Sequence, residues 1–336
     1  MVAVRPAILP KIKTNREPHT KANSLCQLKM MEKPDIKDIT GEQLSTWLEK
    51  EGIAPYRTGQ ILRWIYKRQA DAFEQMTDIS KEIRSRLSSH FTINRLEKIR
   101  VEQSEDGSRK YLFGLKDGNR IESVLIPERG HSTLCISSQV GCAQGCRFCL
   151  TGKGGFVRNL SRGEILVQVR DIQHSLANPE HLTNIVLMGM GEPLANYRNV
   201  ADALNVLTDT AAGFSFAGRR VTLSTAGLLP RLADLGIETT VNLAISLNAT
   251  DNRTRDRLMP INKKYPIEQL LDACRNYPLK PHRRITFEYI LLKGINDSEE
   301  DAGRLARLLR PIKAKINLIP FNAYEGSDFQ LSLIHI

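Results

Sequence analysis

Long apolar runs are missing from this sequence, and so is any arrangement of paired cysteines. Although 41% of the 336 residues are hydrophobic, no stretch approaches the roughly 18 apolar residues that a membrane-spanning helix requires. Arg5 and Pro6 interrupt the apolar start, which excludes the core of a secretory signal peptide. A chain of this length can bury its own core and does not need a disulfide framework. We therefore expect a soluble protein with one large domain and a small one.

Two common nucleotide-binding motifs are missing as well. The glycines at Gly189 and Gly191 are followed by Leu194, where a G-x-G-x-x-G motif has its third glycine. The run at Gly152 lacks both the upstream glycine and the following Ser or Thr of a P-loop. Neither a dinucleotide fingerprint nor a P-loop is present.

What the sequence does contain is three cysteines within eight residues, Cys142, Cys146 and Cys149. Their thiolates select zinc or an iron-sulfur cluster, and both usually take four protein ligands. Three cysteines on a 4Fe-4S cluster leave one iron open to a substrate or cofactor. A structural zinc site needs a second cysteine pair, but Cys26 and Cys274 are isolated. The pattern therefore favours an iron-sulfur cluster, which fits a reducing cytoplasm.

The charge balance favours a polyanionic partner. Lys and Arg number 48 against 37 Asp and Glu, which gives a net charge of +11 and an isoelectric point near 9.4. RNA is the leading partner, because cationic side chains that neutralise phosphates release counterions. A basic surface without a binding role explains the same charge.

Two segments precede the apolar alternation of the large domain. Residues 1–33 combine prolines and basic residues without periodicity, which predicts a disordered basic tail. Residues 34–95 show helical patterns, the first opened by a capping box at Thr40 and Gln43, and predict a small helical accessory domain that contacts RNA. A solvated helix face explains its basic residues equally well. These basic residues are Arg57, Arg63, Lys67 and Arg68.

Residues 96–130 are predicted as a β-hairpin connector. Alternating segments at 109–115 and 120–126 flank a Lys-Asp-Gly-Asn turn, which is a strong hairpin signal. Glu122 lies on the second of these strands. From the pattern alone it is an outward-facing strand residue.

Beyond residue 131, apolar strands and amphipathic helices alternate. This predicts an α/β fold, a partial (βα)6 TIM-like barrel over 131–330 with its active site at the carboxyl ends of the strands. The cysteine loop follows the first strand, at that end. The predicted strands are 133–137, 184–188, 221–224, 241–247, 284–292 and 316–320. The predicted helices are 164–174, 197–208, 228–235, 267–276 and 299–309.

Polar residues and glycines follow several of these strands. Glycine lets backbone approach a ligand closely, and the carboxylate of Glu192 can accept from an ammonium group. Ser and Asn side chains there can bind ribose or a carboxylate, although they are also common turn residues. The candidate ligand-binding residues are Gly191, Glu192, Ser224, Ser246, Leu247, Asn248 and Asn322.

These motifs together resemble a known family. The spacing Cys-x3-Cys-x-Phe-Cys and the Gly-Glu-Pro at 191–193 resemble the radical S-adenosylmethionine (SAM) superfamily. The whole set resembles the RlmN family of dual-specificity 23S rRNA and tRNA adenine-C2 methyltransferases, from about residue 35 to about 330. The segments that carry the resemblance are 121–127, 133–142, 189–193, 221–225, 244–247 and 317–322.

The resemblance implies a role for each candidate residue. The three clustered cysteines would hold one 4Fe-4S cluster, and the seven strand-end residues would bind SAM. Glu122 is implied as the proton acceptor near the target adenine. Cys135 is implied as the residue that resolves a protein-RNA crosslink, through a transient disulfide with a C-terminal cysteine.

The resemblance also implies a reaction. One SAM methylates the C-terminal cysteine, and a second SAM is cleaved to a radical that takes hydrogen from that methyl group. The resulting radical adds to C2, an electron-poor carbon without a nucleophilic lone pair. The implied targets are adenosine-2503 of 23S rRNA and adenosine-37 of tRNA. An electron donor such as flavodoxin and a monomeric protein are expected.

The sequence departs from the family pattern after Gln330. Residues 331–336 form an atypical terminus, and no cysteine follows Cys274, which lies in a predicted helix as a buried thiol. We expect a C-terminally truncated chain that binds the cluster and SAM but cannot complete methyl transfer. The alternatives are a Cfr-type adenine-C8 methyltransferase, a radical SAM enzyme acting on a small molecule, and a zinc-containing RNA-binding protein.

Overall fold

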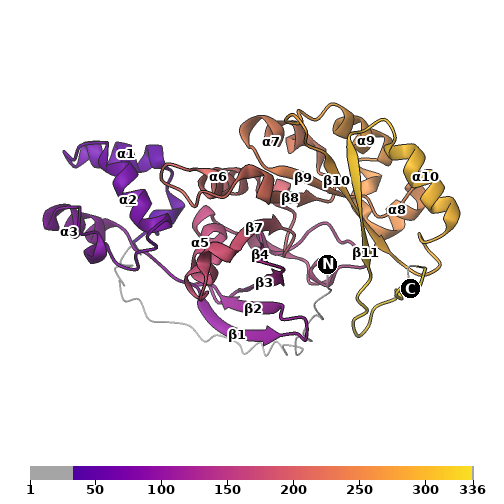
Figure 1. Ribbon diagram of the computed structural model, residues 1–336, viewed down its shortest axis with the longest axis horizontal. Helices are drawn as coiled ribbons and strands as arrows, with labels where there is room; N and C mark the ends of the chain where they lie inside the picture. The colour runs from indigo at the N-terminus through magenta and orange to yellow at the C-terminus, as the bar shows by residue number, and fades with distance from the viewer. Residues whose placement is uncertain (1–32, 335–336) are drawn as a thin grey trace, which may run out of the picture.

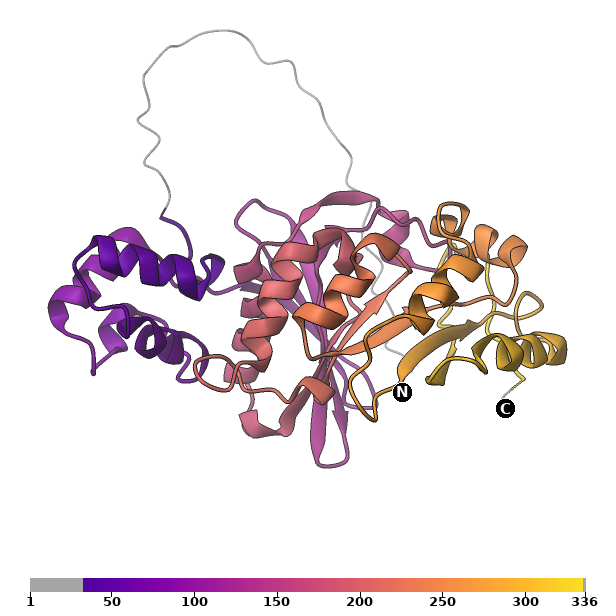
Figure 2. The ribbon, with the colours of Figure 1, turned by 90° about the horizontal axis from the view of Figure 1, so that it is seen from above.

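A lobe of three helices and one large sheet make up the protein (Figure 1). The computed structural model describes residues 33–334, so the predicted tail at 1–33 lies outside the described residues apart from its last position. The lobe contains α1 (Gly41–Lys50), α2 (Arg57–Tyr66) and α3 (Lys81–His90). Both ribbon views place this lobe at the end of the molecule opposite the last helix and strand of the chain (Figures 1 and 2).

Local sequence explains how the lobe begins. The Thr40 hydroxyl accepts a hydrogen bond from the Gln43 N–H at 3.2 Å, and the Gln43 side chain accepts one from the Thr40 N–H at 2.8 Å. This predicted capping box satisfies two donors that a helix start otherwise leaves unpaired. Leu44 on α1, together with Ile61 and Ile65 on α2, is fully buried, so the apolar helix faces form the core of the lobe.

Nine strands form one mixed sheet in the order β1-β2-β3-β4-β7-β8-β9-β10-β11. Strands β1 to β4 pair antiparallel, and the six strands from β4 onward pair parallel. The strands are β1 (Glu97–Gln103), β2 (Arg109–Gly114), β3 (Arg120–Glu128), β4 (His131–Cys135), β7 (Leu182–Leu187), β8 (Val221–Thr225), β9 (Asn242–Ser246), β10 (Ile285–Leu291) and β11 (Ala314–Pro320).

Helices connect the parallel strands and cover one face of the sheet, as the view from above shows (Figure 2). The longest, α5, has 13 residues, and no described helix is long and apolar enough to cross a membrane. The apolar residues Leu223, Ile245 and Phe287 are fully buried beneath this helical layer. The helices are α5 (Arg162–His174), α6 (Tyr197–Thr208), α7 (Leu232–Glu238), α8 (Asn252–Leu258), α9 (Ile267–Arg275) and α10 (Glu299–Leu309).

The predicted partial barrel is confirmed, with differences where periodicity is weak. The six predicted barrel strands match observed strands with ends that differ by at most two residues. The helix predicted at 228–235 begins only at Leu232, because Pro230 lies in a preceding 3-10 turn. The sequence did not predict β1, whose first five residues are all exposed. It also did not predict α8, which is short and mostly polar.

Helix α5 attaches the lobe to the barrel through two buried arginines. Arg170 is fully buried and donates to the Ala70 carbonyl and to the Asp71 carboxylate, both at 2.7 Å. Arg162, the first residue of the same helix, donates to the Lys37 carbonyl at 2.6 Å. Buried arginines that satisfy backbone carbonyls fix the orientation of the lobe, because an unpaired carbonyl in this contact is costly.

The attachment can be tested with Arg170→Met. This variant removes the donor to the Ala70 carbonyl, and we expect the free energy of unfolding to fall by about 2–4 kcal/mol in urea denaturation. Arg100→Met is the matched control, because the Arg100 side chain on β1 is 62% exposed. Its unfolding free energy should change by no more than about 0.5 kcal/mol. Equal stability of the two variants would contradict this account of the attachment.

Candidate functional site

The loop after β7 lies directly against the segment that follows β4. The N–H groups of Ser138 and Gln139 both donate to the Met190 carbonyl, at 2.8 and 3.1 Å. In return the Met190 N–H donates to the Ser137 hydroxyl at 2.9 Å, and the Glu192 N–H donates to the Gln139 side-chain oxygen at 2.8 Å. These bonds, which we call the β4–β7 seam, fix the Gly-Met-Gly-Glu loop to the chain that leads into the cysteines.

Only glycine fits at two positions of this seam. Gly191 has a φ of +106°, and a Cβ there would lie 2.6 Å from the Cβ of Gln139. A Cβ on Gly189 would lie 2.8 Å from the Ile136 carbonyl oxygen. The two glycines are therefore required for close backbone approach, as their position at a strand end predicts.

Glu192 is enclosed at the end of this loop and only 3% exposed. One carboxylate oxygen accepts from the Leu194 N–H at 3.1 Å and the other from the Ala226 N–H at 2.7 Å. Burial raises the pKa of the carboxyl, and these N–H donors oppose the rise. The carboxylate links the β7 loop to the segment after β8, and a hydrogen bond with the Thr225 side chain also opposes the rise in its pKa.

The three clustered cysteines lie on a loop between β5 (Gln139–Gly141) and the short helix α4 (Leu150–Lys153). All three are half-buried. Burial raises the pKa of Cys142 to about 11 and that of Cys146 to about 12, and the charge of the neighbouring Cys149 thiolate adds to both increases. The three thiols lie within eight consecutive residues of one loop.

An apolar cluster covers one side of the cysteine loop. Cys146 and Phe148 pack against an apolar cluster that contains the buried side chains of Leu258 and Met259. The Arg147 N–H donates to the Leu258 carbonyl at 2.9 Å, which ties the loop to the end of α8. The aromatic residue of the cysteine motif therefore helps to anchor the loop on this cluster.

Strand register brings four predicted site residues to one face of the sheet. Cys135 pairs with Val186, and Val186 pairs with Thr222. Paired residues point to the same side, and residues two apart on a strand share a face. The same relation extends through β3 on one side and through β9 and β10 on the other. The four residues are Glu122, Cys135, Ser224 and Ser246.

Glu122 and Cys135 occupy the antiparallel side of this face. The Glu122 side chain is 38% exposed, and one carboxylate oxygen lies 3.6 Å from the buried Lys110 ammonium. The Ser137 hydroxyl donates to the Glu122 backbone carbonyl at 2.6 Å. The Cys135 thiol is surrounded by protein, and this burial raises its pKa to about 12.

The described cysteines form no disulfide. All five cysteines within residues 33–334 are free thiols. The disulfide that the family resemblance implies for Cys135 is therefore not formed in this structure. Cys274 is buried on α9, as its helical position predicts, and burial raises its pKa to about 12.

Three predicted ligand-binding side chains are open to a ligand. Within residues 33–334, the hydroxyls of Ser224 and Ser246 have no hydrogen-bond partner. Both lie near the carboxyl ends of their strands. Asn322 follows β11 and is half-buried.

Two further predicted residues serve the protein itself. The Leu247 side chain is fully buried, and its N–H donates to the Glu288 carbonyl at 3.0 Å. Asn248 has a φ of +57°, and its side-chain oxygen accepts from the Ile290 N–H at 2.8 Å. The Leu247 carbonyl accepts from Arg255 at 3.0 Å and the Asn248 amide donates to the Met259 sulfur at 3.3 Å, so the structure engages both residues internally.

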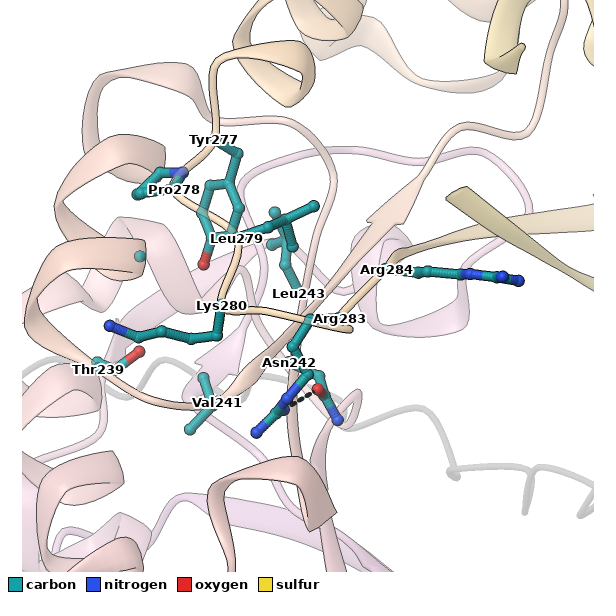
Figure 3. A pocket seen from close by; sticks show the side chains of 11 residues that line it. Thr239, Val241, Asn242, Leu243, Tyr277, Pro278, Leu279, Lys280, Arg283 and Arg284 are labelled. Carbon is teal, nitrogen blue, oxygen red and sulfur yellow. Dashed lines mark hydrogen bonds between the residues drawn. The ribbon is translucent and has the colours of Figure 1, made fainter. Parts of the chain in front are cut away.

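The detected cavities lie away from this face. One, of about 10 Å³, lies at the amino ends of β9 and β10, where Arg283 donates to Asn242 (Figure 3). It has room for about one water. A cavity of about 630 Å³ lies between the lobe and the β2–β3 hairpin, and Arg158 pairs there with Asp117 and Glu164. Neither cavity contains a predicted site residue.

Comparison with known proteins assigns this arrangement to a family. Residues 136–306 match the radical SAM superfamily, and residues 34–93 match the ribosomal RNA large subunit methyltransferase N-terminal domain. The dual-specificity RNA methyltransferase RlmN of Desulfosudis oleivorans is 60% identical over 296 residues, which cover 88% of this chain and 80% of that protein. This chain belongs to the RlmN family.

Other relatives agree with the assignment. The RlmN of Geobacter sulfurreducens is 52% identical over 296 residues, 88% of this chain and 81% of that protein. A solved radical SAM methyltransferase from Sphaerobacter thermophilus is 40% identical, with a TM-score of 0.83 over 90% of this chain and 89% of that one. The likeness extends across the RlmN-type lobe and the barrel.

Membership of the radical SAM superfamily implies a 4Fe-4S cluster and SAM. The residues present fit the cluster, because the loop offers three half-buried thiols beside an apolar wall. The fit is one of donor type and number. Within residues 33–334, no three His, Cys, Asp or Glu side chains are placed so that they could hold a metal ion together.

Sequence reasoning missed the residues that hold the site together. Gln139 accepts from the Glu192 N–H, and Asn196 donates to the Ser138 and Leu160 carbonyls at 2.8 Å. Arg255 is fully buried, and its charge favours the Cys146 thiolate. Gln139 follows two serines in the sequence, and nothing in the local pattern marks either Gln139 or Arg255.

Gly191→Ala tests the seam. The added methyl group would overlap the Gln139 side chain and strain a left-handed backbone, so we expect a loss of about 2–4 kcal/mol in unfolding free energy. Gly294→Ala is the control, because Gly294 has a φ of +68° with no atom within 4 Å of the added Cβ. It should lose only about 1–2 kcal/mol, the backbone part of the cost. Equal losses in urea denaturation would show that the overlap with Gln139 is unimportant.

Proposed function

We propose that this chain is a radical SAM methyltransferase of the type that methylates C2 of adenosine-2503 in 23S rRNA and of adenosine-37 in tRNA through a methyl-cysteine intermediate, with the C-terminal methyl-accepting cysteine missing from these 336 residues. Membership of the RlmN family supports the reaction class and an RNA substrate. One structural observation carries the proposal. Strand register puts Glu122 and Cys135 on the same face as Ser224 and Ser246, at whose edge the cysteine loop begins.

In this proposal the three clustered cysteines hold the 4Fe-4S cluster, which when bound supplies the electron that cleaves SAM. Ser224 and Ser246 offer free hydroxyls, and Glu192 offers a buried acceptor suited to the SAM ammonium group. The close approach at Gly191 exposes backbone to the ligand. The full SAM-binding set is Gly191, Glu192, Ser224, Ser246, Leu247, Asn248 and Asn322. Two SAM molecules are used per turnover.

Glu122 and Cys135 act on the RNA in this proposal. Glu122 accepts the proton from adenine C2, which its partial exposure allows. Cys135 resolves the protein-RNA crosslink. Its raised pKa means that the thiol must lose a proton to become a nucleophile, so this step should accelerate as the pH rises toward about 12.

The lobe at 34–95 and the hairpin connector at 96–130 would present the RNA to the core at 131–330. The net charge of +11 supports a polyanion. Several lobe residues also have protein partners: Lys67 donates to the Thr210 carbonyl at 2.6 Å, and Arg68 lies 4.2 Å from the Trp64 ring. Arg57 likewise donates to the Gln60 side chain at 2.7 Å, so the exposed Arg63 is the better candidate for phosphate contact. The proposal includes a monomeric protein and a donor such as flavodoxin.

Cluster binding and SAM cleavage are tested with Cys149→Ala. After anaerobic reconstitution with iron and sulfide, the unaltered chain should show the brown iron-sulfur absorption and release 5'-deoxyadenosine with SAM and dithionite. Cys149→Ala should lose the absorption and at least about 100-fold of the cleavage rate. Cys274→Ala, a buried cysteine on α9, should retain both. Iron-free protein that contains zinc would contradict the proposal.

The methyl-cysteine intermediate is tested with a polypeptide of these 336 residues. No cysteine follows Cys274 in them, so this polypeptide should cleave SAM without multiple-turnover formation of 2-methyladenosine in 23S rRNA or tRNA. Mass spectrometry of the RNA nucleosides measures 2-methyladenosine and distinguishes it from 8-methyladenosine. Multiple turnovers of 2-methyladenosine would overturn the proposed intermediate, and 8-methyladenosine would identify a Cfr-type reaction instead.

A further inference from the structure

Arg255, on α8, is a fully buried cation at the carboxyl ends of two barrel strands. Its Nε donates to the Leu247 carbonyl at 3.0 Å, and one terminal nitrogen donates to the carbonyls of Ala226 and Ser246 at 2.8 and 3.1 Å. The other terminal nitrogen donates to the side-chain oxygen of Asn262 at 3.0 Å. Every one of these acceptors is electrically neutral.

Among residues 33–334, no carboxylate forms an ion pair with Arg255. Asp256 is the carboxylate whose charge acts on the pKa of Arg255, but it accepts a hydrogen bond from Asn262 at 2.7 Å and not from Arg255. Burial lowers the pKa of Arg255 to about 10, because a cation removed from water without a paired anion is costly. A nearby anion would offset that cost.

The cysteine loop is the part of the chain that would supply such an anion. Cys146 packs against an apolar cluster that contains Ala226 and Met259. The Ala226 carbonyl accepts from the Arg255 guanidinium at 2.8 Å, and the Met259 N–H donates to the Arg255 carbonyl at 2.7 Å. The loop is tied to the same helix end by the Arg147 N–H bond to Leu258. Cys146 and Arg255 therefore share neighbours, and the guanidinium is the cation that favours the Cys146 thiolate against its burial.

We propose that Arg255 is the buried counter-charge of the cluster held by the three clustered cysteines and that it raises the cluster's reduction potential. This inference rests on the cluster binding of the proposed function. One-electron reduction adds a negative charge, and a cation fixed nearby in a low-dielectric interior stabilises the reduced state more than the oxidised one. Arg255 is thus a positioning and electrostatic residue, because it also fixes the Ser246 and Leu247 carbonyls.

The test is a redox titration of the reconstituted 336-residue chain, followed by EPR of the reduced cluster. Arg255→Gln keeps hydrogen-bonding capacity but removes the charge, and the cluster should become about tenfold harder to reduce, which is about 59 mV for one electron. Arg257→Gln is the matched control, because Arg257 is exposed on the same helix. Its potential should equal that of the unaltered chain.

Arg255→Lys separates charge from hydrogen bonding. It keeps the charge but loses the guanidinium fork, so the unfolding temperature should fall while the potential stays within about twofold in the reduction equilibrium. A reduction equilibrium that is tenfold less favourable in Arg255→Lys than in the unaltered chain would overturn the proposal. The Arg255→Lys result also decides the matter if circular dichroism shows that Arg255→Gln fails to fold.

The outcomes separate this inference from the proposed function. A normal cluster whose potential is the same in Arg255→Gln and in the unaltered chain overturns the counter-charge alone. A chain that assembles no cluster overturns both.

Discussion

The backbone bonds of the β4–β7 seam are the constraint on which the rest of the site depends. Two N–H groups donate to the Met190 carbonyl, and the Gln139 side-chain oxygen accepts from the N–H of Glu192. Glu192 then reaches across to Ala226 after β8. Three successive parallel strands are thereby joined at their carboxyl ends. The close approach that Gly189 and Gly191 allow therefore fixes the β7 loop against the segment that leads into the cysteines.

The two faces of the sheet divide the work of the protein. Apolar residues such as Leu223, Ile245 and Phe287 lie beneath the helices and stabilise the barrel. Hydroxyl, thiol and carboxylate groups lie on the opposite face of the sheet, which the helices do not cover. Strand alternation produces this division directly, because side chains two residues apart share a face. The antiparallel strands β1 to β3 extend the polar face beyond the barrel and bring Glu122 to it.

Sequence reasoning predicted most of the barrel and the cysteine motif, because both depend on local patterns. The capping box at Thr40 is a local motif and the strand-helix alternation is a periodic pattern. The observed elements follow both closely. The polar contacts of the seam were not predictable, since Gln139 and Glu192 are far apart in the chain. Arg255 was missed for a different reason. Its importance comes from complete burial, and an arginine in a short polar helix gives no sign of that.

We propose that the three clustered cysteines would hold a 4Fe-4S cluster and that SAM would bind to it beside Glu192 and the strand ends. The most direct measurement is pulsed EPR of the reduced, reconstituted protein with SAM labelled with 15N in the amino group and 17O in the carboxylate. The account predicts hyperfine coupling of both labels to the cluster. A reduced cluster that shows no coupling to either label, at SAM concentrations that saturate the protein, would contradict it.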